Sequence, residues 1–247
     1  MFLRGEDAGP AIPIHSIDQK GGIMSTTLLA SQLQDGSESA PIRLQVATMI
    51  DDLMSQLPKP GQMTAEQRRG MIARYTAVLE GNFIYWMTAT LLAVHSEDAR
   101  PILVDNLMEE VRESHPVMLR KFTLAAGAFP RTEDALAVHE NMTKLRLFLG
   151  KLQGVQSLLT MAFFEGFIQK YMPYLAELAA LQGSTEMEYT DVHGVCDIAH
   201  SEGLFQAVEL ENSLNPIGPD ADLFEGVELL RDVVYSITRE PATELAA

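Results

Sequence analysis

Apolar residues recur with a helical period along almost the whole chain from residue 41 onward, and this pattern restricts the chain to an all-α fold. An amphipathic segment, 42–57, closes at the turn sequence PKPG, and Thr64 begins a long apolar-rich segment that reaches about His95. Turn and capping residues delimit the further helices, at about 96–110, 115–127, 132–149, 154–181, 185–214 and 221–238. Strand-like alternation is absent from the sequence. We therefore expect a bundle of seven or eight helices.

The length and composition fit one large domain. A chain of 247 residues, 47% of them apolar, can bury one substantial core. We expect residues 41–240 to form this single helical domain, with flexible tails at 1–40 and 241–247. The first 40 residues mix charges with Gly and Pro and lack the apolar core of a signal peptide. No run of about 18 apolar residues occurs, so we expect a soluble protein without a membrane partner.

The charge balance narrows the range of partners. A formal net charge of −16 argues against binding to nucleic acid or to anionic lipid, both of which need a basic surface. The single cysteine, Cys196, excludes an internal disulfide and fits a cytoplasmic location, and we expect it to pack rather than to bind metal. The expected partner is a small molecule, and a homodimer is compatible with the sequence.

Residues 193–200 read HGVCDIAH and carry the strongest functional signal. At about 100° per residue, His193, Asp197 and His200 fall within roughly 60° on one face of a helix. Burying these polar side chains is costly unless a cation or another partner compensates them. Two neutral imidazoles and a carboxylate suit Fe(II), Mn(II) or Zn(II), and with open coordination positions they suit iron that activates oxygen.

Two further carboxylates lie in strongly apolar helical sequence. Glu165 occurs in MAFFEGFI and Glu80 in YTAVLEGNFIYW, where an acid is costly unless a cation neutralises it. The alternative for each is an ordinary glutamate on the solvent face of an amphipathic helix. We predict that both are metal ligands.

The segment NLMEEVRESHP, residues 106–116, supplies the remaining candidates. In one continuous helix Glu110 and His115 would point about 140° apart. Pro116 disfavours a helical conformation at His115, so one helix should end soon after Glu110 and another should begin at His115. Both side chains would then lie at a corner between helices. Glu109 and Glu113 remain alternatives to Glu110.

The order of these motifs resembles the haem-oxygenase-like di-iron oxidases and oxygenases over roughly residues 70–205. The shared features are NLxEE, a short gap, HP, a lone glutamate in an apolar helix, and HxxxDxxH. The resemblance implies a haem-oxygenase-like bundle with the metal site in its core. The di-iron ligands that it implies are Glu110, His115, Glu165, His193, Asp197 and His200. Glu80 matches the place of an extra carboxylate in the N-oxygenating branch, which would make it a seventh ligand.

The resemblance also implies the chemistry. The cofactors would be two iron ions that cycle between Fe(II) and Fe(III), with O2 as co-substrate and an external reductant. We expect an O2-dependent oxidoreductase, a monooxygenase that N-oxygenates a small amine or amino-acid-like metabolite in biosynthesis. The alternative is a di-iron desaturase, C–C lyase or decarboxylase that acts on an amino or fatty acid. An alternative of another class is a metal-poor binding protein on the same fold.

Overall fold

The structure is a computed structural model that describes residues 15–17, 23–25 and 40–239. The described part of the chain forms nine α-helices and one short 3₁₀ helix, Pro60–Gln62. The α-helices are α2 (Ala40–Ser55), α3 (Ala65–Leu79), α4 (Asn82–Ala93), α5 (Arg100–Arg112), α6 (His115–Ala125), α7 (Thr132–Leu149), α8 (Gly154–Leu181), α9 (Glu188–Leu214) and α10 (Glu225–Thr238). The predicted all-α bundle is therefore confirmed.

The helix count exceeds the expected seven or eight because the segment expected between Thr64 and His95 is two helices. α3 ends at Leu79, and Gly81 adopts a left-handed conformation with φ of 76° before α4 begins. Glycine occupies this region of φ without a steric penalty, whereas most other residues do not. The sequence predicts one segment from Thr64 to about His95, and the structure shows that Gly81 divides it.

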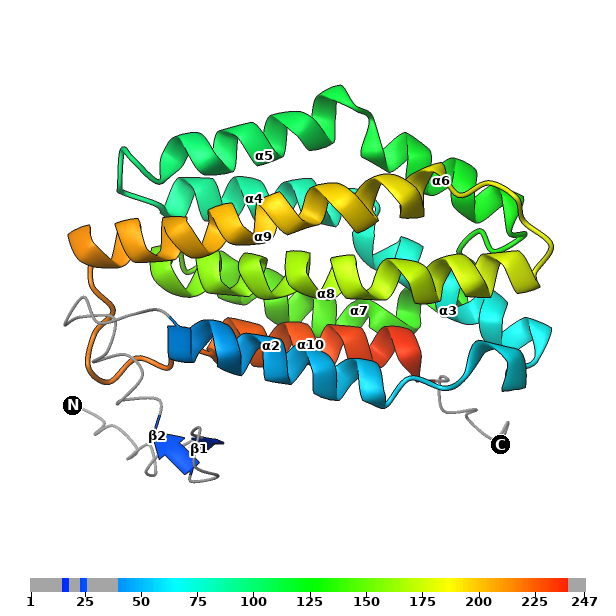
Figure 1. Ribbon diagram of the computed structural model, residues 1–247, viewed down its shortest axis with the longest axis horizontal. Helices are drawn as coiled ribbons and strands as arrows, with labels where there is room; N and C mark the ends of the chain where they lie inside the picture. The colour runs from blue at the N-terminus through cyan, green and yellow to red at the C-terminus, as the bar shows by residue number, and fades with distance from the viewer. Residues whose placement is uncertain (1–14, 18–22, 26–39, 240–247) are drawn as a thin grey trace, which may run out of the picture.

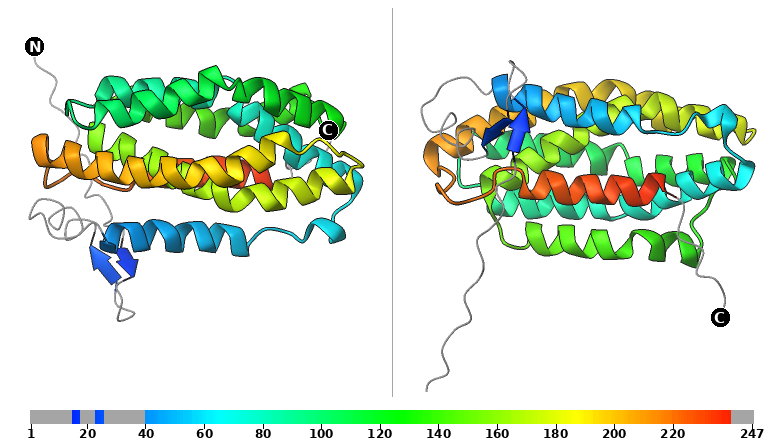
Figure 2. Two further views of the ribbon diagram at one scale, coloured as in Figure 1. Left: turned by 45° about the horizontal axis from the view of Figure 1, so that its top comes forward. Right: turned by 90° about the horizontal axis from the view of Figure 1, so that it is seen from below.

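The helices pack around α8, which runs through the middle of the bundle (Figure 1). α9 lies beside α8 along most of its length, α4 and α5 cover one side of this pair, and α2 and α10 lie on the other. Two further views show the same arrangement, with α7 packed against α10 (Figure 2). The core is thus one continuous apolar cluster that contains residues from every described α-helix.

α8 is buried on every side over its first half. Its residues from Gly154 to Ile168 are all buried, including the rings of Phe163, Phe164 and Phe167. A helix that is apolar all round is typical of the centre of a large core, and each such ring contributes roughly 1.5 to 3 kcal/mol by leaving water. Glu165 lies within this stretch and is only 1% exposed. The fold therefore places a carboxyl group within a fully buried stretch of helix.

Outside the bundle the structure describes two strands of three residues, β1 (His15–Ile17) and β2 (Ile23–Ser25). They pair antiparallel, with Ser16 opposite Met24. This short pairing lies within the segment 1–40, for which the sequence predicts a tail and no strand. The rest of that segment, apart from Ala40, and the expected tail 241–247 lie outside the described residues. Among the described helices, none is both long and apolar enough to cross a bilayer.

The close approach of α10 to α7 and α8 depends on Gly226. A Cβ atom at this position would overlap the hydroxyl of Thr160 and the ring of Phe148. We predict that Gly226→Ala lowers the free energy of unfolding by about 1 to 3 kcal/mol because the packed helices must separate. Urea unfolding followed by circular dichroism measures the effect.

Gly61→Ala is the control, because a Cβ atom there meets nothing within 4 Å. Its effect should stay within about 0.5 kcal/mol. Equal stability of the two variants would contradict the packing argument.

Candidate metal centre

A corner between α5 and α6 brings the first two candidate ligands together. α5 ends at Arg112, Ser114 takes a left-handed φ of 59°, and α6 begins at His115, with Pro116 in its first turn. A left-handed residue just after the end of a helix is a common way to stop it, and proline fits the start of the next. The predicted break is confirmed. It places His115 Nδ1 2.8 Å from Glu110 Oε1.

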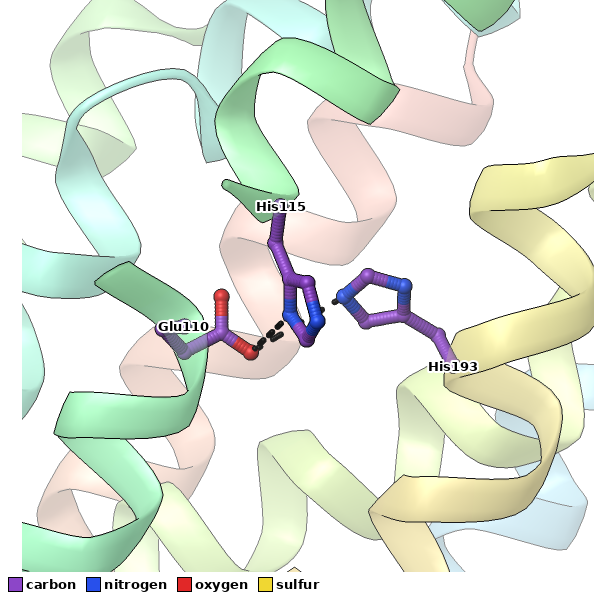
Figure 3. A group of neighbouring side chains, drawn as sticks. All are labelled: Glu110, His115 and His193. Carbon is purple, nitrogen blue, oxygen red and sulfur yellow. Dashed lines mark hydrogen bonds and ion pairs between the residues drawn. The ribbon is translucent and has the colours of Figure 1, made fainter. Parts of the chain in front are cut away.

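α9 supplies the third member of this cluster. His193 Nε2 lies 3.8 Å from Glu110 Oε1, and the rings of His193 and His115 meet edge to face at 4.4 Å. The three side chains point toward one another from α5, α6 and α9 (Figure 3). One potential ligand atom from each lies within 4.8 Å of the others. We call these three residues the Glu110 group.

A second cluster lies between α8 and α9. His200 Nδ1 is 3.7 Å from Glu165 Oε1 and 3.9 Å from Asp197 Oδ1. The ligand atoms of Glu165, Asp197 and His200 also lie within 4.8 Å of one another. We call these three residues the Glu165 group. The six residues that the resemblance implied are thus brought together as two groups of three, and their role as ligands remains a prediction.

The electrostatics of the two groups fit bound cations. All six side chains are buried, with residue exposures from 0% for Asp197 to 8% for His200. Burial, followed by the charges of Asp197 and Glu110, raises the pKa of Glu165 well above its usual value. His200 Nδ1 is buried and has no hydrogen-bond partner among the described residues, although it faces two carboxyl groups. A metal ion would neutralise the carboxylates and occupy this nitrogen, so the residues fit a metal centre.

His193 is held in the neutral form that binds metal. His193 Nδ1 donates to the backbone carbonyl of Tyr189 at 2.8 Å, so the lone pair of Nε2 faces the Glu110 group. Burial lowers the pKa of His193 to about 4, although the Glu110 carboxylate opposes the shift. Burial also acts to lower the pKa of His115, but its hydrogen bond to Glu110 raises that pKa above the usual value. A hydrogen bond at the outer ring nitrogen fixes the tautomer and the ring orientation of a histidine ligand.

The three neighbouring glutamates, left as alternatives by the sequence, occupy different places. Glu110 belongs to the first group. Glu109 Oε2 accepts from His200 Nε2 at 3.1 Å, on the side of that ring away from Glu165. The side chain of Glu113 is 52% exposed and lies 3.4 Å from His115 Nε2. Glu109 and Glu113 therefore contact candidate ligands from outside the two groups.

Glu80 lies apart from both groups. It is the residue that follows the last turn of α3, its side chain is 28% exposed, and its carboxylate pairs with Arg120. The structure brings it into neither group, so its role as a seventh ligand stays a prediction. The side chain of Cys196 lies outside the described residues.

Sequence reasoning missed two residues that support the groups. Asn106 Nδ2 donates to Glu165 Oε1 at 3.2 Å, and Tyr189 orients His193 through its backbone. Each lies one helical turn before a candidate ligand, Asn106 before Glu110 and Tyr189 before His193. Spacing of i to i+4 from a candidate ligand was the available signal.

A small cavity opens beside the Glu110 group. Its volume is about 20 Å³, which is enough for about one water molecule. Besides Glu110, Glu165, His115, His193 and Tyr189, its lining is apolar, and consists of Leu79, Gly81, Phe83, Ile84, Pro116, Leu119 and Ile168. The segment that joins α3 to α4 thus forms one wall of the site.

Comparison with known proteins agrees with this geometry. Residues 72–226, more than half of the chain, match a protein-family model described as iron-containing redox enzyme, of the haem-oxygenase-like superfamily. The match contains all six residues of the two groups, and it favours an enzyme over a metal-poor binding protein. Among curated proteins, no sequence matches the chain significantly.

The burial of Glu165 predicts opposite effects of one substitution with and without metal. In the metal-free protein Glu165→Leu should raise the free energy of unfolding by about 1 to 4 kcal/mol, because it removes a carboxyl group from an apolar, acidic environment. Fe(II) should stabilise the wild type more than the variant. Thermal unfolding with a chelator and with anaerobic Fe(II) measures both effects.

Glu177→Leu is the control for that experiment, because Glu177 lies on the same helix but is exposed. It should change stability by no more than about 0.5 kcal/mol. A metal-free Glu165→Leu protein that is less stable than the wild type would contradict the assignment.

The two outer glutamates should differ in their effect on metal affinity. Glu109→Ala removes the acceptor that orients His200, so it should weaken one metal site by about 10- to 100-fold. Glu113→Ala is the matched control, since its longer contact is exposed to solvent. Competition with a chelating dye gives both affinities. If the two variants lose affinity equally, Glu109 has no special role.

Proposed function

The chain belongs to this family of iron-containing redox enzymes, and we propose that it is a non-haem di-iron enzyme that uses O2 to oxidise a small amine or amino-acid-like metabolite by N-oxygenation. The observation that carries the proposal is the pair of three-residue groups with no shared residue. Each offers histidine and carboxylate donors to one ion. The groups share α9 as a support, since His193 belongs to one and Asp197 and His200 to the other.

The donor count supports two divalent ions. The six residues carry three carboxylates and three imidazoles, so two Fe(II) ions would more than offset the buried negative charge. Three protein donors per ion leave coordination positions free for O2, water or substrate. Histidine and carboxylate donors also keep both the ferrous and the ferric state accessible, which a redox centre requires.

The residues around the proposed iron ions have different roles. Iron, when bound, would supply electrons to O2. The six residues of the two groups would hold the ions. Tyr189 and Glu109 orient the rings of two of the histidines, and the apolar cavity wall limits the access of water. An external reductant would return the ions to the ferrous state after turnover.

One observation favours the second candidate function, the oxidation of a C–H bond in an amino or fatty acid by desaturation, cleavage or decarboxylation. The lining of the cavity contains no lysine or arginine among its described residues, and its wall is aliphatic and aromatic. Such a wall binds an apolar chain better than a charged group. The cavity has room for about one water molecule, so the binding of either substrate requires its wall to move.

We propose the cytoplasm as the site of action and a small molecule as the partner. The support is the composition, with its acidic charge balance and single cysteine. A homodimer remains our expectation for the oligomeric state.

The separate groups predict how ligand variants lose iron. The wild type should bind close to two Fe(II) per chain under anaerobic conditions. His193→Ala and Asp197→Ala should each bind about one, because each removes a donor from a different group. Isothermal titration and elemental analysis give the stoichiometry.

Glu177→Ala serves as the control for iron binding, and it should still bind two ions because Glu177 is exposed and belongs to neither group. A wild type that saturates with one ion and shows no optical change on adding O2 would refute the di-iron proposal. The same reduced protein, mixed with O2 and a panel of amines and fatty acids, distinguishes the two reactions. Hydroxylamine or nitro products support N-oxygenation, whereas alkenes or shortened chains support the second candidate.

A further inference from the structure

Two buried tyrosines form a hydroxyl pair directly behind the Glu110 group. The ring of Tyr189, in the first turn of α9, lies 4.2 Å from the ring of His193. Its hydroxyl lies 2.8 Å from the hydroxyl of Tyr75, which α3 contributes. Tyr75 is 0% exposed and Tyr189 is 3% exposed. The redox-active ring of Tyr189 thus contacts a candidate ligand, His193, and its hydroxyl contacts a second redox-active side chain, Tyr75.

The surroundings confine any exchange of protons to this pair. Tyr171 is the next tyrosine, with its ring 5.6 Å from that of Tyr75, but its buried hydroxyl has no hydrogen-bond partner among the described residues. The other ring against Tyr189 is Phe122, which has no O–H bond to break. Hydrogen-atom exchange needs a shared hydrogen bond, so it can run between Tyr189 and Tyr75 and is not continued to Tyr171.

Tyr189 also faces the space where the oxidant would form. It lines the small cavity together with Glu110, Glu165 and His193. Its backbone carbonyl holds His193 in place, so the ring and the candidate ligand keep a fixed relation. The geometry therefore gives Tyr189 both contact with the centre and a proton-sharing partner.

From this arrangement we infer that Tyr189, backed by Tyr75, donates one electron and one proton to the oxidised iron centre. The inference rests on the proposed function, because the oxidant is the product of O2 and ferrous iron. The two ferrous ions supply two of the four electrons that reduce O2 to water. When no substrate supplies the other two, the O–H bond of Tyr189 would break and give the third electron, with its proton passing to an oxygen atom derived from O2. The external reductant, or a further Fe(II) ion from solution, would give the fourth electron, and solvent would give the remaining protons.

The resulting neutral tyrosyl radical is shared by the pair. Transfer of a hydrogen atom across the 2.8 Å contact regenerates the Tyr189 hydroxyl and leaves the radical on Tyr75, with atoms and electrons balanced. Burial shields it from solvent. A hydrogen-atom donor of the thiol or ascorbate class restores the pair. The tyrosines would thus take up oxidising equivalents that would otherwise attack the ligands.

The test uses the full chain loaded with Fe(II) without air, mixed with O2 in the absence of substrate, and frozen at intervals for electron paramagnetic resonance. The wild type should give a radical signal that narrows when the protein contains ring-deuterated tyrosine. Tyr189→Phe should lose it, and Tyr75→Phe should shorten its lifetime several-fold because the radical loses its hydrogen-bond donor. Tyr85→Phe is the control, since Tyr85 is exposed on α4, and it should behave as the wild type.

Iron content, O2 consumption and melting temperature are measured on the same samples. If two ions bind and O2 is consumed, but no deuterium-sensitive radical forms or it survives unchanged in Tyr189→Phe, the inference is overturned while the proposed function stands. If Tyr189→Phe fails to fold or to bind iron, Tyr75→Phe decides, and an unchanged signal shape and lifetime overturns the inference. Absence of iron binding or O2 consumption in the wild type refutes the proposed function, and the tyrosine inference falls with it.

Discussion

The burial of three carboxyl groups in an apolar helical core is the constraint on which the rest of the structure depends. Glu165 lies in the fully buried part of α8, and Asp197 and Glu110 face it from two other helices. Charges of one sign in such a place are unfavourable by themselves, so the folded state is satisfied only with protons or cations. The same carboxyl groups therefore affect both stability and activity. Ions that would support turnover would also neutralise the negative charge in the core.

Two local features of the backbone bring the candidate donors together around these buried carboxyl groups. Within α9, the spacing of His193, Asp197 and His200 puts three donors on one face without any change of backbone. Between α5 and α6, the left-handed residue Ser114 turns the chain so that His115 faces Glu110. The first arrangement keeps its geometry under local changes because it is part of the long helix α9. The second is set by a few residues and depends on the helices that pack against the corner.

The sequence was a sufficient guide where one helical period or one proline decides the outcome. It predicted the all-α bundle, the break before Pro116 and the face that carries His193, Asp197 and His200. It could not choose among Glu109, Glu110 and Glu113, since the choice depends on the rotation of α5 relative to α9. It also joined α3 to α4, because a glycine within an apolar run is compatible with either a helix or a break. The hydroxyl pair of Tyr75 and Tyr189 joins residues 114 positions apart, which periodicity does not reveal.

The segment around the break at Gly81 lines the cavity without supplying a candidate ligand. Residues 79–84 contribute a wall of the cavity but no member of either group, whereas the six candidate ligands all follow residue 100. Substitutions in the wall can therefore alter the shape offered to a substrate while the donors stay intact. Substitutions within residues 79–84 can change which substrate fits without removing a candidate iron ligand. Relatives with the same donors and different residues at 79–84 should accordingly differ in what they oxidise.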